Sequence, residues 1–84
     1  MSAGDVVTLY GRAGCHLCFE ARVRLEEMRA AGAGFELREV DIESDPELHR
    51  RMLEKIPVIE VDGVVVSELS LDARALRARL DTVG

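Results

Sequence analysis

The chain has 84 residues, of which 48% are hydrophobic and 32% are charged. This length accommodates one domain with one core, and the balance of apolar and charged residues is that of a globular protein rather than a disordered one. The net charge of −5 argues against nucleic-acid binding, because phosphate contacts require a concentrated basic face and the arginines here alternate with acidic residues.

The N-terminal residues 1–5 have neither the basic flank nor the apolar segment of a signal peptide. No later run approaches the roughly 18 apolar residues that a membrane span requires. We therefore expect a cytoplasmic protein that contacts no membrane.

The first predicted strand covers residues 6–10, where apolar side chains occupy both faces, as in a strand at the middle of a sheet. The glycine-containing segment 11–14 ends this strand. From Cys15 the apolar residues recur at helical spacing, which predicts a helix that ends at the glycines of residues 31–34. The buried face of this helix comprises Cys18, Ala21, Leu25 and Met28.

The second predicted strand begins at Phe35 and alternates through Leu37, but Val40 and Ile42 fall in the opposite phase. A bulge near residues 38–39, or a switch from one buried face to the other, would explain this change.

A short helix follows, and the sequence offers two possible starts for it. Ser44 and Glu47 fit a capping box, or Asp45 is the cap with Pro46 at the first helical position. The spacing directs three apolar residues toward the core, namely Leu48, Met52 and Leu53.

Two apolar runs, residues 56–61 and 64–66, are joined by Asp62-Gly63. This pattern predicts a two-residue hairpin, because both turn positions need positive φ. Ser70 is the predicted cap of a last helix that has Asp72 in its first turn. The buried stripe predicted for this helix comprises Leu69, Ala73, Leu76 and Leu80.

The predicted fold is therefore α/β, with the order β-α-β-α-β-β-α, a four-stranded mixed sheet and helices on both faces. We expect the first two strands to be parallel through a right-handed crossover, and the hairpin to add an antiparallel edge.

Two cysteines, Cys15 and Cys18, are the only ones in the chain, and they stand where a strand gives way to a helix. A helix N-terminus offers unpaired N–H groups and a partial positive charge, which favour a thiolate at Cys15, and Arg12 is available to add a positive charge. Cys18 lies one turn inside the helix and is more shielded. The placement predicts thiol–disulfide chemistry in which Cys15 attacks and Cys18 resolves.

The alternatives for this pair are a structural disulfide or half of a metal site. Zinc requires four ligands, and the only other soft candidates are His16, in the same turn, and His49, on another helix. His16 either tunes the thiolate when protonated or lies in solvent. For His49 we expect a surface position, and for Tyr10 a packing role.

The element order, with Cys-x-x-Cys opening the first helix, resembles the thioredoxin fold and, within it, the glutaredoxin-like proteins. Residues 10–18 look like the family's strand end, basic residue and dithiol, Ile56-Pro57 matches its cis-proline site, and Asp62-Gly63 matches its hairpin turn. The resemblance covers nearly the whole chain. It implies one glutaredoxin-like domain over residues 1–84, and a thiol–disulfide oxidoreductase that reduces protein or low-molecular-weight disulfides through catalytic Cys15 and Cys18.

The resemblance also implies a substrate site around the dithiol. Pro57 is expected to be cis and to face the dithiol, which leaves the backbone N–H and C=O of Ile56 free to pair with a substrate peptide. At the glycine pair that holds glutathione in the family, this chain has Ser67-Glu68, and a negative Glu68 would repel the carboxylates of glutathione. The expected substrate-binding residues are Arg12, Ile56, Pro57, Ser67 and Glu68.

We expect no bound cofactor and no metal, a monomer, and an electron donor that is glutathione, another small thiol or a flavin-dependent reductase. Two other functions remain open at this stage. One is an iron–sulfur or metal carrier, in which Cys15 and an external thiol ligate a cluster shared between two subunits, as in some glutaredoxins. The other is a redox-inactive interaction module, against which the intact cysteine pair counts.

Overall fold

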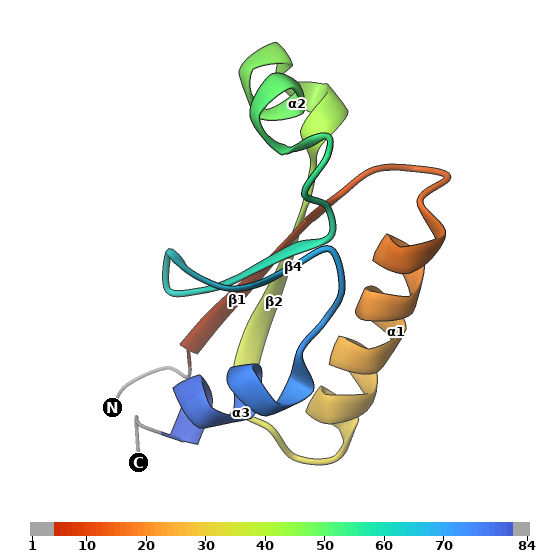
Figure 1. Cartoon of the computed structure of the whole chain (residues 1–84). Coiled ribbons are helices and arrows are strands. Elements are labelled where there is room, and N and C mark those ends of the chain that lie inside the picture. Colours follow the sequence, from red (N-terminus) through yellow and green to blue (C-terminus); the bar gives the residue numbers. More distant parts are fainter. Residues whose placement is uncertain (1–4, 82–84) are drawn as a thin grey trace.

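A computed structural model describes residues 5–81 of the chain (Figure 1). The elements follow in the predicted order, with one short 3₁₀ helix, η1, added after the second strand. None of the helices within residues 5–81 is long and apolar enough to cross a membrane. The elements are β1 (Asp5–Gly11), α1 (His16–Ala30), β2 (Phe35–Asp41), η1 (Ile42–Ser44), α2 (Pro46–Met52), β3 (Val58–Val61), β4 (Val64–Glu68) and α3 (Ala73–Asp81).

The four strands form one mixed sheet in the order β2-β1-β3-β4. β1 pairs in parallel with β2 and antiparallel with β3, and β3 and β4 form the predicted hairpin. β1 is therefore a central strand, as predicted, and buries Val7 and Leu9 on one face while Tyr10 packs on the other. The loop that follows the end of β1 leads to the dithiol at the start of α1.

Helices α1 and α3 cover one face of the sheet, and α2 lies beyond the end of β2, at the top of Figure 1. Leu25 of α1 and Leu76 of α3 are fully buried against Val7 and Ile59 of the sheet. Met52 of α2 belongs to a second buried cluster, which contains Cys18, Ile42, Ile56 and Val58. The dithiol thus lies next to this smaller core.

The phase change in β2 is a switch between the two faces of the sheet. The parallel register runs without interruption from Asp5 opposite Phe35 to Gly11 opposite Asp41, so the β1–β2 ladder contains no bulge. Phe35 is buried in the core under α1 and α3, whereas Ile42, just beyond the strand, is buried in the cluster beneath α2.

The start of α2 follows the second of the two predicted alternatives. The Asp45 side chain accepts a hydrogen bond from the Glu47 N–H at 2.9 Å, and Pro46 occupies the first helical turn. Met52 is buried and Leu48 half-buried, but the prediction that Leu53 points inward is wrong, because its side chain is 38% exposed. α2 ends at Met52, so Leu53 is its C-cap and lies past the buried face.

The hairpin turn has the predicted residues in the predicted conformation, with φ of 51° at Asp62 and 87° at Gly63. The start of α3 differs from the prediction. Asp72, not Ser70, is the cap, because its carboxylate accepts from the Ala75 N–H at 3.0 Å. Leu69 is also not part of the buried stripe: it adopts a φ of 70° in the connecting loop and is 57% exposed.

The tip of the hairpin is fastened to the start of β1. Asp62 accepts a hydrogen bond from the Val6 N–H through Oδ1 at 3.0 Å and donates its own N–H to the Val6 carbonyl at 2.8 Å. Burial, a hydrogen bond with Asp62 and the negative charge of Asp62 together raise the pKa of Asp5, against the opposing charge of Arg79. The negative charge of Asp62 therefore favours the protonated form of Asp5.

We expect Asp62→Asn to stabilise the protein at neutral pH, because asparagine keeps the Oδ1 acceptor, tolerates positive φ and removes the like charge beside Asp5. A raised folded-state pKa means that the folded protein binds this proton more readily than the unfolded chain, so the wild type gains stability as pH falls through that pKa. Urea unfolding at pH 7 and at acidic pH measures this gain. The gain in stability is expected to be smaller in Asp62→Asn than in the wild type, and unchanged in the exposed control Glu54→Gln. Equal gains in all three proteins would contradict the interaction between Asp5 and Asp62.

Candidate active site

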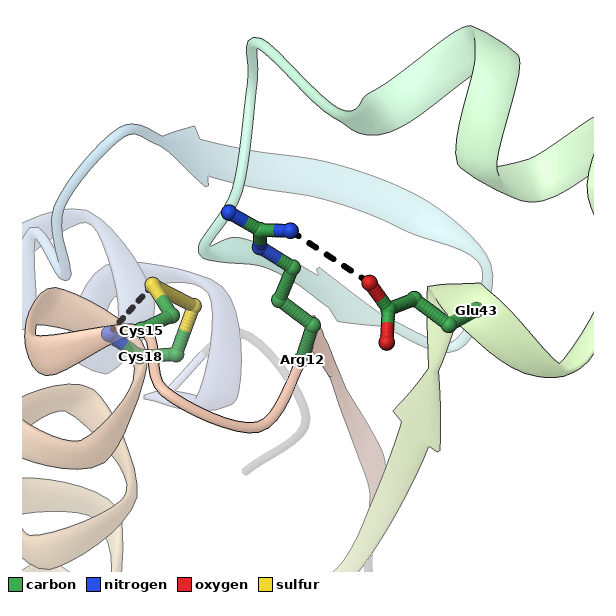
Figure 2. Close-up of a disulfide and its surroundings, with 4 residues drawn as sticks. All are labelled: Arg12, Cys15, Cys18 and Glu43. Atoms are coloured by element: carbon green, nitrogen blue, oxygen red, sulfur yellow. Dashed lines mark hydrogen bonds and ion pairs between the residues drawn. A yellow bond between two sulfur atoms is a disulfide. The ribbon is translucent and has the colours of Figure 1, made fainter.

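Cys15 and Cys18 form a disulfide at the N-terminus of α1 (Figure 2). Cys15 is the N-cap residue with extended backbone dihedrals, φ −88° and ψ 109°, and Cys18 lies in the first turn, with Cα atoms 5.2 Å apart. Cys15 is half-buried, whereas Cys18 is only 6% exposed. The two sulfur atoms therefore differ in access, as the chemistry of an attacking and a resolving thiol requires.

The backbone around Cys15 is arranged to stabilise negative charge on its sulfur. The Cys18 N–H donates to Cys15 Sγ at 3.2 Å, and the Cys15 N–H donates to the Arg12 carbonyl at 3.3 Å. The first turn of α1 contains no acidic residue. An N–H group and the N-terminal end of the 15-residue helix α1 therefore lie at the Cys15 sulfur, where a helix carries partial positive charge.

Gly11, the last residue of β1, makes room for Cys18. A side-chain carbon placed on Gly11 would lie 3.0 Å from both Cβ and Sγ of Cys18. A side chain at Gly11 would therefore press on Cys18 unless the strand and the helix shift apart by a few tenths of an ångström. Sequence reasoning treated this glycine only as the end of a strand, because the contact depends on how α1 folds back over β1.

Arg12 directs one guanidinium nitrogen toward Glu43, just past the end of β2 (Figure 2). Its Nη1 atom lies 3.3 Å from Oε2 of Glu43 in η1, and the two side chains are 42% and 48% exposed. The ion pair thus joins the loop that carries Cys15 to η1, directly after β2. The positive charge predicted to assist the thiolate is shared with Glu43, which sequence reasoning did not identify.

His16 and Tyr10 have local partners. His16 Nε2 lies 2.8 Å from Oε2 of Glu20, one helical turn further along α1, and both side chains are largely exposed. Tyr10 packs in the core, as predicted, and donates its hydroxyl to Glu60 at 3.2 Å. Burial, followed by the negative charge of Glu60, raises the pKa of Tyr10, which keeps its hydroxyl protonated at neutral pH.

His49 lies half-buried on α2. Within residues 5–81 no group of three or more His, Cys, Asp or Glu side chains is placed to hold a metal ion.

The Ile56–Pro57 peptide bond is cis, which confirms that prediction. Ile56 packs with Cys18 in the smaller core, and the Pro57 ring is fully buried. The expectation of a free Ile56 N–H is wrong, because this group donates to the Met52 carbonyl at 3.1 Å. The loop after α2 folds back on the last turn of the helix and uses this N–H, whereas the Ile56 carbonyl accepts no backbone hydrogen bond within residues 5–81.

Ser67 and Glu68 end β4 beside the Ile56–Pro57 segment. Glu68 is exposed and lies opposite Val58, and the next N–H, that of Leu69, donates to the Lys55 carbonyl at 2.9 Å. Ser67 lies opposite Ile59, and its Oγ is buried without a hydrogen-bond partner among the described residues. The structure thus brings Glu68 to the surface next to Ile56–Pro57 and directs the Ser67 hydroxyl inward.

A cavity of about 360 Å³ opens beside the disulfide, between the start of α1 and the end of β2. Sequence reasoning did not predict this cavity. It also did not single out Phe19, the residue directly after Cys18, which is 55% exposed. The lining residues are Leu9, Gly11, Arg12, Ala13, Gly14, Cys15, Cys18, Phe19, Arg22, Glu39, Val40 and Asp41.

The model of the glutaredoxin-like domain family (DUF836) matches residues 6–81. The chain belongs to this family. A search of curated proteins finds no match for this glutaredoxin-like chain.

Solved structures agree with the family. Protein Ne2328 from Nitrosomonas europaea has 27% sequence identity and a TM-score of 0.81, with 95% of each chain covered. Protein XcR50 from X. campestris has 31% identity and a TM-score of 0.62, covering 90% of this chain and 96% of that chain. A glutaredoxin from Brucella melitensis has 26% identity and a TM-score of 0.59, covering 96% of this chain and 84% of that chain. This glutaredoxin-like protein therefore has the thioredoxin-like fold that its sequence predicts.

Proposed function

We propose that this glutaredoxin-like protein is a thiol–disulfide oxidoreductase that reduces disulfides of proteins or small thiols. The observation that carries the proposal is the cysteine pair at the N-terminus of α1, where the Cys18 N–H donates to Cys15 Sγ and Cys18 itself is buried. A structural disulfide needs neither this hydrogen bond nor a difference in exposure between its two sulfur atoms.

The first step uses the reduced protein. The Cys15 thiolate attacks one sulfur of a substrate disulfide, so a Cys15–substrate disulfide forms as the substrate S–S bond breaks. The other substrate sulfur leaves as a thiolate and takes a proton from solvent. Cys15 is the accessible sulfur, and the N–H of Cys18 is already directed at it, which favours its ionised form before the attack.

The second step resolves the mixed disulfide. Cys18 loses its proton and attacks Cys15 Sγ, which forms the Cys15–Cys18 disulfide and releases the second substrate thiol. The substrate has then gained two electrons from the protein and two protons, one taken from solvent in the first step and one made up by the proton that Cys18 lost. Two equivalents of a donor thiol, or one dithiol of a reductase, return the electrons and complete the cycle.

The proposed electron donor is a thiol or reductase other than glutathione. Glu68 is exposed beside Ile56–Pro57 at a position where the resemblance implies glycine, and its negative charge opposes the carboxylates of glutathione. We expect Glu68→Gly to increase glutathione-dependent turnover severalfold and to leave turnover with a flavin-dependent reductase little changed. A charge reversal at an exposed residue of the loop between α2 and β3, Glu54→Lys, serves as the control. Equal glutathione-dependent rates in wild type and Glu68→Gly would contradict this role.

The proposed activity is tested by supplying a peptide mixed disulfide together with either glutathione or a thioredoxin reductase as the electron source. We expect turnover with at least one donor, and loss of that turnover in Cys15→Ser. Failure with every donor, together with a Cys15 thiol no more reactive than a free thiol, would favour an interaction module. Colour on anaerobic purification would instead favour an iron–sulfur protein.

A further inference from the structure

We infer that the cavity beside the disulfide is a subsite for a basic residue of the substrate, so that the preferred substrates are polypeptides with lysine or arginine close to the reacting cysteine. The inference rests on the proposed oxidoreductase function and specifies the substrate class for the same dithiol. It also identifies Asp41, at the end of β2, as a residue that determines specificity.

The position of the cavity makes it accessible to a substrate attached to Cys15. Both cysteines line it, and the glycine-rich loop between β1 and α1 forms part of its wall. Gly11 lies opposite Asp41 in the parallel ladder, and a side chain at Gly11 would collide with Cys18. The absence of a side chain at Gly11 therefore leaves room for Cys18. It also places the disulfide close to the end of β2, where Asp41 lies.

The charged groups around the cavity leave one carboxylate without a cationic partner. Arg12 pairs with Glu43 at 3.3 Å, and Arg22 lies 3.7 Å from Glu39. The Asp41 carboxylate accepts only the backbone N–H of Glu43, at 2.8 Å, and pairs with no cation within residues 5–81. Once each arginine is matched with its acid, the remaining charge is negative and lies at Asp41.

The remaining walls suit the stem of a basic side chain. Leu9, Val40 and Phe19 provide apolar surface, and Phe19 is already 5.9 Å from the guanidinium of Arg22, which shows that its ring accepts a cation. Lysine and arginine pack their aliphatic stems on apolar surface while the charged head stays near water and a counter-charge. A neutral side chain would contact only the apolar walls, and an acidic side chain would be repelled by Asp41.

The test is a single-turnover reaction of the pre-reduced protein, which needs no electron donor. Three peptides each carry one cysteine, flanked by lysine, alanine or glutamate, in a disulfide with the neutral thiol 2-mercaptoethanol. The rate constant for each peptide is divided by its rate constant with dithiothreitol, which corrects for intrinsic reactivity. We expect the corrected rate constant of the lysine peptide to exceed that of the alanine peptide by about 1.5- to 5-fold, which is the range for a partly exposed charge pair. The glutamate peptide should have the smallest corrected rate constant.

Two pairs of variants assign the effect to the cavity. Asp41→Asn keeps the acceptor for the Glu43 N–H and should reduce the lysine-to-glutamate ratio toward one, whereas Glu36→Gln, the same change earlier on β2, should not alter the ratio. Phe19→Ala should slow the lysine peptide, whereas Val23→Ala, an exposed residue of α1 outside the lining, should not.

High salt should also reduce the ratio in the wild type, because the charges are partly exposed. A wild-type ratio of one or below, or an unchanged ratio in Asp41→Asn, would overturn the subsite. Failure of all three peptides to oxidise the protein would overturn the proposed function itself.

Discussion

Cys15→Ser is expected to abolish turnover while leaving the fold intact. Cys15 is half-buried at the helix cap, and serine is a favoured N-cap residue that can accept the Cys18 N–H in the same way. The variant should therefore unfold in urea close to the reduced wild type. A loss of activity without a loss of stability would identify the Cys15 sulfur as the nucleophile.

Cys18→Ser is expected to give a different phenotype, in which a mixed disulfide accumulates on Cys15. Without the resolving thiol the second step fails, and mass spectrometry should detect one substrate thiol bound per chain. Cys18→Ala controls for the cost of placing a serine hydroxyl in an apolar cluster, since alanine also removes the thiol but adds no polar group. Equal activity in the Cys15 and Cys18 variants would contradict the assignment of the two roles.

Gly11→Ala is expected to impair both stability and the resolving step. The added carbon would lie 3.0 Å from Cβ and Sγ of Cys18, so the first turn of α1 must move away from β1. Overpacking of this kind costs about 1–3 kcal/mol, and displacement of Cys18 should slow closure of the disulfide. Urea unfolding of the reduced protein measures the first effect, and the rate of intramolecular disulfide formation measures the second.

Gly34→Ala is the matched control, because an added carbon at Gly34 meets nothing within 4 Å. Reduced freedom of the unfolded chain should make this variant neutral or more stable by about 0.4–1 kcal/mol. If Gly11→Ala were as stable as Gly34→Ala and closed its disulfide at the wild-type rate, the close contact between β1 and Cys18 would not be needed.

Local patterns in the sequence were sufficient to predict the elements and the dithiol. The helical spacing of Cys18, Ala21, Leu25 and Met28 placed all four in the core, and Asp62-Gly63 specified the turn by its need for positive φ. These features depend on a few neighbouring residues. The resemblance added Ile56-Pro57, whose cis bond no local pattern would predict.

Other features depend on contacts between distant segments, and local patterns did not determine them. Ser44 and Asp45 both satisfy the rules for a helix cap, and only the path of the chain through η1 decides in favour of Asp45. The Ile56 N–H is occupied because the loop after α2 folds back on Met52.

The cavity depends on the β1–β2 register, which places Gly11 opposite Asp41 although the two residues are thirty positions apart in the sequence. Sequence reasoning assigned no role to Phe19, whose side chain is 55% exposed directly after Cys18.

The central claim is that the start of α1 stabilises the Cys15 thiolate. It is tested most directly by the pH dependence of alkylation of the reduced protein by iodoacetamide, with mass spectrometry to locate the modified cysteine. We predict that Cys15 is modified first, with a midpoint about one to two units below the pKa of about 8.5 of a free thiol. A midpoint at or above that value, or modification of Cys18 before Cys15, would contradict it.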